Sequence, residues 1–204
     1  MNPFPRRPTE VPLGFERRPL DASHEIWVGS LPDGLLRSNE HFETLWDLHP
    51  PEFPTIKLRG RLVPLPRWQE AYGANYRFSG ITMVAMEIPD VLEPFFEWAR
   101  DAADVRLNGA LLNWYDGKLG HYIGRHRDST IGMVIGAPIV TISLGETRVF
   151  RVRKWKGAGV VNFLVSNGSA LVMPYATNLA WTHEIPKTKR ATGRRISITL
   201  RAFE

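Results

Sequence analysis

The segment RRISITLR, residues 194–201, decides the fold because polar and apolar side chains alternate along it with a period of two. Such alternation predicts a β-strand with one face on a hydrophobic core, since successive side chains of a strand point to opposite faces. Ile196, Ile198 and Leu200 belong to the apolar face. The polar face carries Arg195, Ser197, Thr199 and Arg201.

The two arginines on the polar face indicate an anion site. An inward-facing guanidinium is costly to desolvate unless it meets an anion, and its planar fork suits a carboxylate. A dicarboxylate would satisfy both Arg195 and Arg201. The alternative is an edge strand whose arginines are solvated.

Beyond residue 106 the chain consists of further short segments rich in β-forming residues, separated by turn residues. These runs span 110–115, 121–126, 139–145, 147–155, 161–165, 169–175 and 180–186. Ahead of them, apolar residues at helical spacing predict helices over 38–49 and 89–103, the second with Pro94 in its first turn. We therefore expect an α+β protein, with a double-stranded β-helix (jelly-roll) core and N-terminal helices buttressing one sheet.

Length and composition are those of one soluble domain. The 204 residues are 43% hydrophobic and 23% charged, so we expect a single domain over 1–204. The prolines and arginine pairs of the first twenty residues predict an extended N-terminal arm over 1–20. Without a signal-peptide core or a long apolar run, we expect a cytoplasmic monomer with no membrane partner.

The chain contains no cysteine, which excludes disulfides, thiolate zinc sites and cysteine nucleophiles. Any metal ion must therefore be held by nitrogen and oxygen. The formal net charge of +5 favours a polyanionic partner such as DNA or RNA. Basic clusters could hold its phosphates, or could simply be solvated: Arg148, Arg151, Arg153, Lys154 and Lys156, then Lys187, Lys189, Arg190 and Arg194.

The stretch GRHRDST, residues 124–130, places His126 and Asp128 two positions apart. In an extended segment both side chains point to the same face, so they can share one metal ion. His183, in WTHEIP, lies on another expected strand. Two histidines and one carboxylate make the arrangement that leaves open positions on ferrous iron. The alternative for His126 and Asp128 is a surface salt-bridged pair.

Taken together, these motifs resemble the AlkB-like iron(II) and 2-oxoglutarate-dependent dioxygenases, in particular the branch that repairs alkylated nucleic acid. The resemblance is collinear and covers residues 64–203. Its motifs are PLPRWQEAYGANYRFSG, LLNWYDG, IGRHRD, WTHEIP and RRISITLRAF, in that order. Several spaced motifs in the right order are far more specific than any one of them.

The resemblance implies Fe(II) as the metal, with 2-oxoglutarate and dioxygen as cosubstrates. It assigns the iron ligands to His126, Asp128 and His183. It assigns the 2-oxoglutarate contacts to Asn113, Tyr115, Arg195 and Arg201, with Arg195 at the distal carboxylate and Arg201 near the keto-acid end. One departure is Ser197, which stands where the family usually has asparagine.

For substrate binding, the resemblance places Tyr76 and Phe78 against an extruded base; plain aromatic core packing is the alternative. Ser129 and Thr130 stand where repair members tend to carry an acid that accepts a hydrogen bond from the alkylated base. We therefore expect these two residues to alter the choice of substrate without affecting the iron chemistry.

The implied function is oxidative dealkylation of N-alkylated nucleic-acid bases, the chemistry of alkylation-damage repair. One alternative is an iron and 2-oxoglutarate hydroxylase of the same fold that acts on a protein, a modified base or a small molecule. Another is a nucleic-acid-binding domain that has kept the fold without catalysis.

Overall fold

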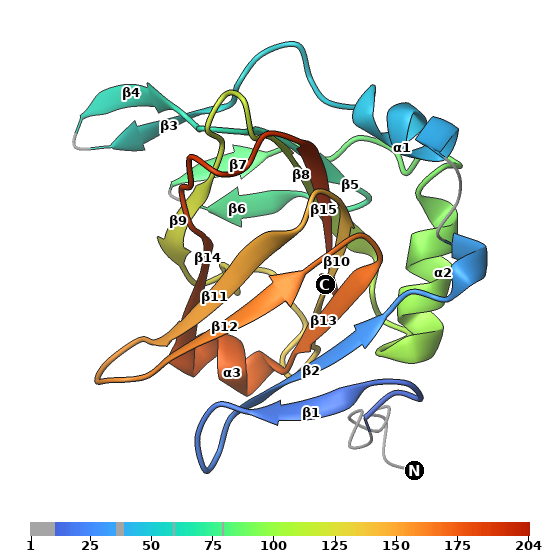
Figure 1. The fold of residues 1–204 in the computed structure, drawn as a ribbon, viewed down its shortest axis with the longest axis vertical. Coiled ribbons are helices and arrows are strands. Elements are labelled where there is room, and N and C mark those ends of the chain that lie inside the picture. The colour runs from blue at the N-terminus through green and yellow to red at the C-terminus, as the bar shows by residue number, and fades with distance from the viewer. Residues whose placement is uncertain (1–10, 36–38, 59, 79) are drawn as a thin grey trace.

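The computed structural model describes residues 11–35, 39–58, 60–78 and 80–204. In this part of the chain two main sheets face each other (Figure 1). The large sheet has the order β1 (Glu16–Pro19), β2 (Glu25–Ser30), β13 (Ser169–Met173), β10 (Ile139–Gly145), β15 (Arg194–Arg201), β8 (Gly109–Asp116) and β5 (Trp68–Tyr72). The small sheet has the order β12 (Val160–Val165), β11 (Arg148–Lys154), β14 (Trp181–Ile185) and β9 (Ile123–His126).

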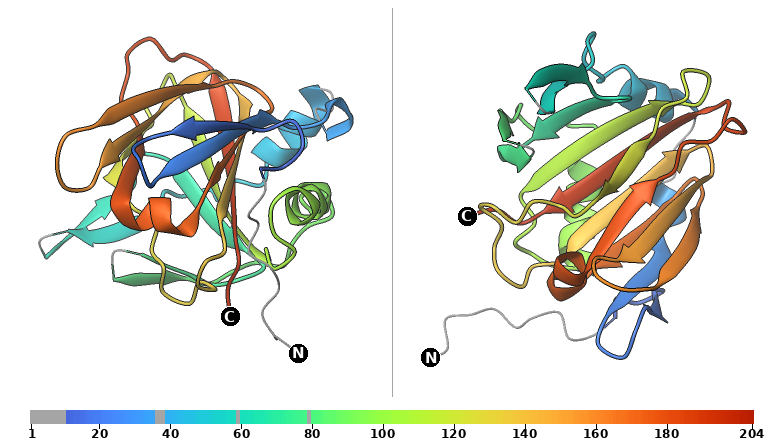
Figure 2. Two further views of the ribbon diagram at one scale, coloured as in Figure 1. Left: turned by 90° about the horizontal axis from the view of Figure 1, so that it is seen from below. Right: turned by 90° about the vertical axis from the view of Figure 1, so that its left-hand side faces the viewer.

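Two hairpins and a few helices complete the described chain. The hairpins are β3 (Thr55–Leu58) with β4 (Arg61–Pro64), and β6 (Tyr76–Phe78) with β7 (Ile81–Met83). The first hairpin projects beyond the main sheets (Figures 1 and 2). The helices are η1 (Asp33–Leu35), α1 (Asn39–Trp46), α2 (Glu93–Ala102) and α3 (Tyr175–Ala180). No helix within the described ranges is long and apolar enough to cross a membrane.

The expected strands are confirmed from β8 to β15. Along the chain these strands pass repeatedly between the large and the small sheet, which is the pattern of a jelly-roll core. The segment 169–175 is a strand only as far as Met173, because α3 begins at Tyr175. The short helix α3 leads directly into β14.

The register between β15 and β8 brings the polar residues of these two strands onto one face. Arg195 lies opposite Tyr115, and Ser197 lies opposite Asn113 on β8. Directly opposed residues of antiparallel strands point to the same side of a sheet. The polar face of β15 and the asparagine and tyrosine of β8 therefore look toward the small sheet together.

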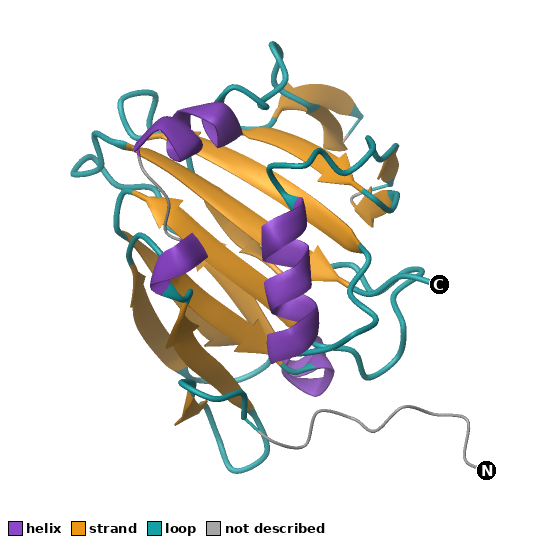
Figure 3. Ribbon diagram, turned by 90° about the vertical axis from the view of Figure 1, so that its right-hand side faces the viewer, coloured by secondary structure: helices purple, strands orange, loops and turns teal. Residues whose placement is uncertain are grey.

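The other face of β15 belongs to the main hydrophobic core. Ile196 and Ile198 are fully buried there in one cluster with Trp46 of α1 and Phe95 of α2. Figure 3 shows η1, α1 and α2 lying on this side of the large sheet. Trp114 of β8 donates from its indole Nε1 to the carbonyl of Leu45 in α1 at 2.9 Å, so the one polar group of this side chain is satisfied inside the core.

The two expected helices form in shortened versions. The second covers Glu93–Ala102, and Pro94 lies in its first turn as expected, where its missing N–H costs no hydrogen bond. The first covers Asn39–Trp46 instead of 38–49, and residues 36–38 lie outside the described part of the chain.

The extended arm expected over 1–20 is described only from residue 11 onward. Residues 1–10 lie outside the described ranges, but Glu16–Pro19 forms the edge strand β1 and pairs with β2. All four of its residues are exposed, so the strand is held by backbone hydrogen bonds and shows no apolar alternation. The strands from β2 to β7 were also missed; most have only three to five residues, too few to display a period.

We predict that Phe95→Ala lowers the free energy of unfolding by about 3–5 kcal/mol, because it opens a cavity between α2 and the large sheet. Glu97→Ala is the matched control, since Glu97 is exposed on the same helix; its effect should stay within about 0.5 kcal/mol. Urea unfolding followed by circular dichroism measures both. Equal stability of the two variants would contradict the packing of α2 described above.

Candidate functional site

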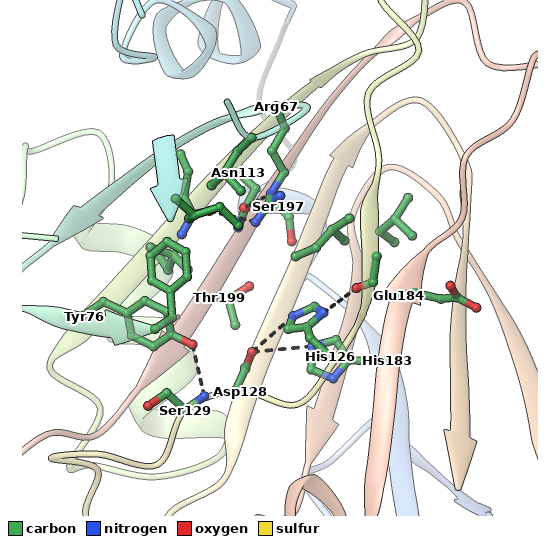
Figure 4. Close-up of a pocket in the computed structure, with 18 of the residues that line it drawn as sticks. Arg67, Tyr76, Asn113, His126, Asp128, Ser129, His183, Glu184, Ser197 and Thr199 are labelled. Carbon is green, nitrogen blue, oxygen red and sulfur yellow. Dashed lines mark hydrogen bonds and ion pairs between the residues drawn. The ribbon is translucent and has the colours of Figure 1, made fainter. Parts of the chain in front are cut away.

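Three side chains converge between the sheets: His126 at the end of β9, Asp128 two residues later, and His183 on β14 (Figure 4). The pairing of β9 with β14 puts the two histidines opposite each other. Oδ1 of Asp128 lies 3.5 Å from Nε2 of each imidazole. Ligand atoms from all three lie within 4.8 Å of one another, so one small cation can contact them together.

The Asp128 carboxylate is buried and already holds one cation. Its Oδ2 accepts hydrogen bonds from Arg201, at 2.6 Å from Nη2 and 3.2 Å from Nε. Burial raises the pKa of Asp128, but the charges of Arg201 and His183 outweigh it and hold the pKa well below its ordinary value. The carboxylate is therefore ionised, with Oδ1 left facing the imidazoles.

Hydrogen bonds fix the orientation of this group. The backbone N–H of Asp128 donates to Oδ1 of Asn178 at 3.0 Å, and Nδ2 of Asn178 donates back to the Asp128 carbonyl at 3.1 Å. Asn178 lies in α3 and is buried, although nothing in its local sequence marked it as part of the site. Its role is visible only because α3 packs beside the segment that follows β9.

The chemistry of the three donors fits a divalent metal ion. Nδ1 of His126 lies 2.8 Å from the carbonyl of Gly124, which can only accept, so this nitrogen carries the proton and Nε2 presents a lone pair. Burial lowers the pKa of His183 and favours its neutral form. Two imidazole lone pairs and a carboxylate oxygen facing one point form a set of acceptors that a cation would bridge.

Arg195 forms a second charged position in the same cavity. Its side chain is 1% exposed, donates from Nε to Oγ of Ser143 at 2.8 Å, and lies 5.0 Å from the ring centre of Tyr115. Burial lowers the pKa of this guanidinium, and its Nη1 has no hydrogen-bond partner among the described residues. A buried guanidinium N–H without a partner can bind the carboxylate of a ligand such as 2-oxoglutarate.

Asn113 faces the cavity beside a residue that the sequence did not single out. Arg67 donates from Nε to Oδ1 of Asn113 at 2.6 Å and from Nη2 to Oε1 of Gln69 at 2.8 Å. Because the amide oxygen of Asn113 is engaged in this way, its Nδ2 is the group left to donate to a ligand. Arg67 is 5% exposed. The motif PLPRWQEAY contains it, but only the fold shows that it lies beside Asn113.

The three cluster residues line one cavity of about 850 Å³ together with Arg67, Asn113, Tyr115, Arg195 and Arg201. Tyr76 and Phe78 form part of its wall, with ring centres 5.5 Å apart. Arg201 lies 4.5 Å from the ring centre of Tyr76, and burial raises the pKa of this phenol to about 12, so the hydroxyl stays protonated. An aromatic wall next to the cluster of His126, Asp128 and His183 is suited to hold a flat ligand.

The two residues after Asp128 occupy different positions. Ser129 lines the cavity, and its backbone N–H donates to the hydroxyl of Tyr76 at 3.4 Å. Thr130 is not among the lining residues, and its carbonyl accepts a hydrogen bond from the N–H of Met133 within a turn. The structure thus brings Ser129, and not Thr130, to the wall that includes Tyr76.

Most of the basic residues expected to bind phosphate are paired with acidic side chains or, in one case, buried against a backbone carbonyl. Glu184 accepts a hydrogen bond from Arg153 at 3.0 Å and lies 3.6 Å from Arg151. Lys154 pairs with Asp21, Arg194 pairs with Glu43, and Arg148 is buried with a hydrogen bond to the carbonyl of His121. The sequence showed the clustering of these cations but not the acids brought to them by folding.

Comparison with known proteins agrees with this geometry. Residues 56–201 match the 2OG-Fe(II) oxygenase superfamily. The chain is 31% identical over 157 residues to the human protein named DNA oxidative demethylase ALKBH2, and 32% identical over 161 residues to its bovine counterpart. These alignments cover 72% of this chain but only 60% and 56% of the two relatives.

A solved structure, that of OsALKBH1, has a similar fold with a TM-score of 0.55 and 17% identity. The match covers 92% of this chain and 100% of that one. At this identity the likeness concerns the fold alone.

We predict that His183→Ala abolishes tight binding of one divalent metal ion, because two remaining donors cannot complete the three-sided cluster. Mutation of a residue that hydrogen-bonds a metal ligand lowers metal affinity roughly 10- to 100-fold, and loss of a ligand itself should lower it further. Anaerobic titration with Fe(II) or Co(II), followed by absorbance, measures it. His24→Ala is the control, because His24 instead faces Asp21 at 2.7 Å. Unchanged metal affinity in His183→Ala would show that the cluster does not bind the ion.

Proposed function

This chain belongs to the 2OG-Fe(II) oxygenase superfamily, and we propose that it removes N-alkyl groups from nucleic-acid bases by oxidation. The observation that carries the proposal is that one cavity holds the His126, Asp128 and His183 cluster, the buried Arg195 and the aromatic wall of Tyr76. A metal centre, a carboxylate site and a surface for a flat ring are what this reaction needs in one place.

Family membership and the three-residue cluster assign Fe(II) as the metal, with 2-oxoglutarate and dioxygen as cosubstrates. Bound iron and 2-oxoglutarate supply the oxidising power that hydroxylates an unactivated C–H bond. His126, Asp128 and His183 would hold the iron. The lone pairs of the imidazoles and Oδ1 of the carboxylate are the groups presented to it.

The chain's own residues position the cosubstrate. In our proposal Arg195 binds its distal carboxylate through the unpaired Nη1, while Asn113 donates from Nδ2 and Tyr115 from its hydroxyl. We propose that Arg201 lies near the keto-acid end of the cosubstrate, and it also donates to Oδ2 of Asp128 at 2.6 Å. It thereby keeps one oxygen of the carboxylate occupied and directs the other toward the metal.

We propose that an alkylated base enters against Tyr76 and Phe78, on the side of the cavity where Ser129 lies. The relatives named DNA oxidative demethylase support DNA as the nucleic acid, although this chain spans only part of their length. Once an N-methyl group is hydroxylated, the product releases formaldehyde in water without a further catalytic group. The protein therefore needs to bind, orient and expose the base to the metal, and little more.

The test is turnover by the purified protein supplied with Fe(II), 2-oxoglutarate and oxygen, on single-stranded oligonucleotides that carry one methylated base. We expect succinate and formaldehyde to form together, with loss of the methyl group by mass spectrometry. Succinate formation without demethylation of any oligonucleotide would contradict the substrate and favour a hydroxylase that acts on another molecule. The absence of both products in metal-loaded protein would leave a binding domain without catalysis.

We also propose that the protein acts as a single domain and a monomer in the cytoplasm, with α1 and α2 serving to buttress the large sheet. The burial of Trp46 and Phe95 against that sheet supports the last point. Light scattering coupled to gel filtration would measure the oligomeric state, and fractionation of cells would give the compartment.

We predict that Arg195→Met weakens 2-oxoglutarate binding by about 2–5 kcal/mol, roughly 30- to several-thousand-fold, because it removes a buried charged partner of a carboxylate. Calorimetry with Mn(II) in place of iron measures the affinity without turnover. Arg194→Met is the matched control, since Arg194 is next in the same strand but pairs with Glu43 at the surface. Similar affinities for the two variants would contradict the role of Arg195.

We predict that Ser129→Asp raises the rate on cationic 1-methyladenine relative to neutral 3-methylthymine by about tenfold, the effect of a hydrogen bond to a charged group. Thr130→Glu is the control, because Thr130 does not line the cavity. Competition between the two lesions in one oligonucleotide mixture measures the ratio. A shift in the Thr130 variant alone, or in neither, would refute the placement of the missing acid at Ser129.

A further inference from the structure

Arg125 and Arg127 flank the metal-ligand candidate His126 and alternate with it along the chain. In an extended segment, neighbouring side chains point to opposite faces, so the arginines project away from the side that carries His126 and Asp128. Both arginines are exposed, yet both contribute to the lining of the cavity. They therefore lie at the mouth of the site, where a bound polymer would enter and leave.

Among the described residues, these two arginines donate their hydrogen bonds to uncharged groups. Nε of Arg125 donates to Oγ1 of Thr182 at 2.8 Å and its Nη2 to the carbonyl of Lys154 at 2.8 Å, while Nη1 of Arg127 donates to the carbonyl of Leu179 at 2.7 Å. All of these acceptors are uncharged. Within the described ranges neither arginine has an ion pair, in contrast to the basic residues on β11 that are paired with acids.

Trp155, directly after β11, lies against the same two guanidinium groups. The centre of the Arg127 guanidinium is 4.5 Å from the indole centroid, and that of Arg125 is 6.0 Å away. The tryptophan is nevertheless 48% exposed. Its backbone N–H donates to the carbonyl of Ala180 at 2.9 Å, so the indole is presented from an anchored position. Aromatic area remains available for a further partner.

The simplest alternative is that the arginines only shield the indole from water. A cation–π contact explains why Arg127 lies over the ring, but it leaves the positive charges uncompensated and nearly half of the tryptophan exposed. An aromatic ring beside free arginines is the combination that binds single-stranded nucleic acid, because bases stack on the ring while phosphates meet the cations. The position at the mouth of the base-binding cavity selects this ligand over an acidic peptide.

We propose that Trp155, Arg125 and Arg127 form a docking subsite for a nucleotide near the target base, with its base stacked on the indole and neighbouring phosphates on the guanidinium groups. This inference rests on the proposed function, since the strand is the substrate itself. A base can stack on Trp155 only when it is free of its complementary strand. The subsite therefore favours single-stranded or locally unpaired substrate over intact duplex.

The test compares a ligand that fills only the cavity with one that also reaches the subsite. The ligands are 1-methyladenosine monophosphate and a fluorescein-labelled single-stranded oligodeoxynucleotide with one central 1-methyladenine. The protein of 204 residues is loaded with Mn(II) and 2-oxoglutarate so that no turnover occurs. We expect Trp155→Ala to weaken binding of the strand roughly 5- to 100-fold, as for loss of one stacked base, and to leave the mononucleotide unaffected.

Three further variants make the result specific. Trp155→Phe should retain most of the affinity because it keeps an aromatic face. Leu164→Ala, on the neighbouring β12, removes another exposed apolar side chain and should change nothing. Arg127→Gln should lower the slope of log affinity against log salt by about 0.7, the value for one phosphate contact on a single strand. Duplex carrying the same lesion should be affected less by Trp155→Ala than the single strand.

The outcomes separate this inference from the function on which it rests. If wild-type protein demethylates and binds the strand, but Trp155→Ala binds it equally well, the subsite is refuted while the function stands. If Trp155→Ala weakens strand and mononucleotide alike, the tryptophan supports the cavity instead and the subsite is also refuted. If the wild-type protein neither binds nor demethylates any strand, the proposed function fails and the subsite fails with it.

Discussion

The buried ion pair between Asp128 and Arg201 is the interaction on which the rest of the site depends. Asp128 follows β9 of the small sheet, and Arg201 ends β15 of the large one, so the pair joins the two layers across the cavity. The two residues are 6% and 2% exposed. Leaving either charge there alone costs about 3–5 kcal/mol, which ties the packing of the two sheets to the state of the carboxylate.

The pair also gives the two carboxylate oxygens of Asp128 different roles. Oδ2 is engaged by the guanidinium, and Oδ1 is left 3.5 Å from each imidazole. A carboxylate that a fixed cation holds ionised keeps its free oxygen available for a metal without first losing a proton. Asn178 fixes the backbone from α3, so the orientation of Asp128 is set from the large sheet and from α3.

Strand β15 shows how one short segment can serve both core and site. Its apolar face packs under the helices with Trp46 and Phe95, and its polar face lies in the cavity between the sheets. The buried polar groups of that face have partners where the protein can provide them, as with Arg195 and Ser143. The unpaired Nη1 of Arg195 stands out because burial makes an unused donor costly unless a ligand meets it.

The sequence by itself determined the strands from β8 to β15, the two helices and the chemistry of the His-Asp-His cluster, because these depend on local periodicity and on residue type. It did not reveal β1 to β7, whose short or polar segments lack a period, nor the roles of Arg67 and Asn178, which act through neighbours distant in the chain.

The net charge of +5 can also be read from the sequence alone. Only the tertiary structure decided which cations remain free, because folding brings Glu184 to Arg151 and Arg153 and leaves the arginines beside His126 without an acid within the described ranges. Charge pairing acts over a few ångströms in space, and that proximity is set by how the two sheets pack.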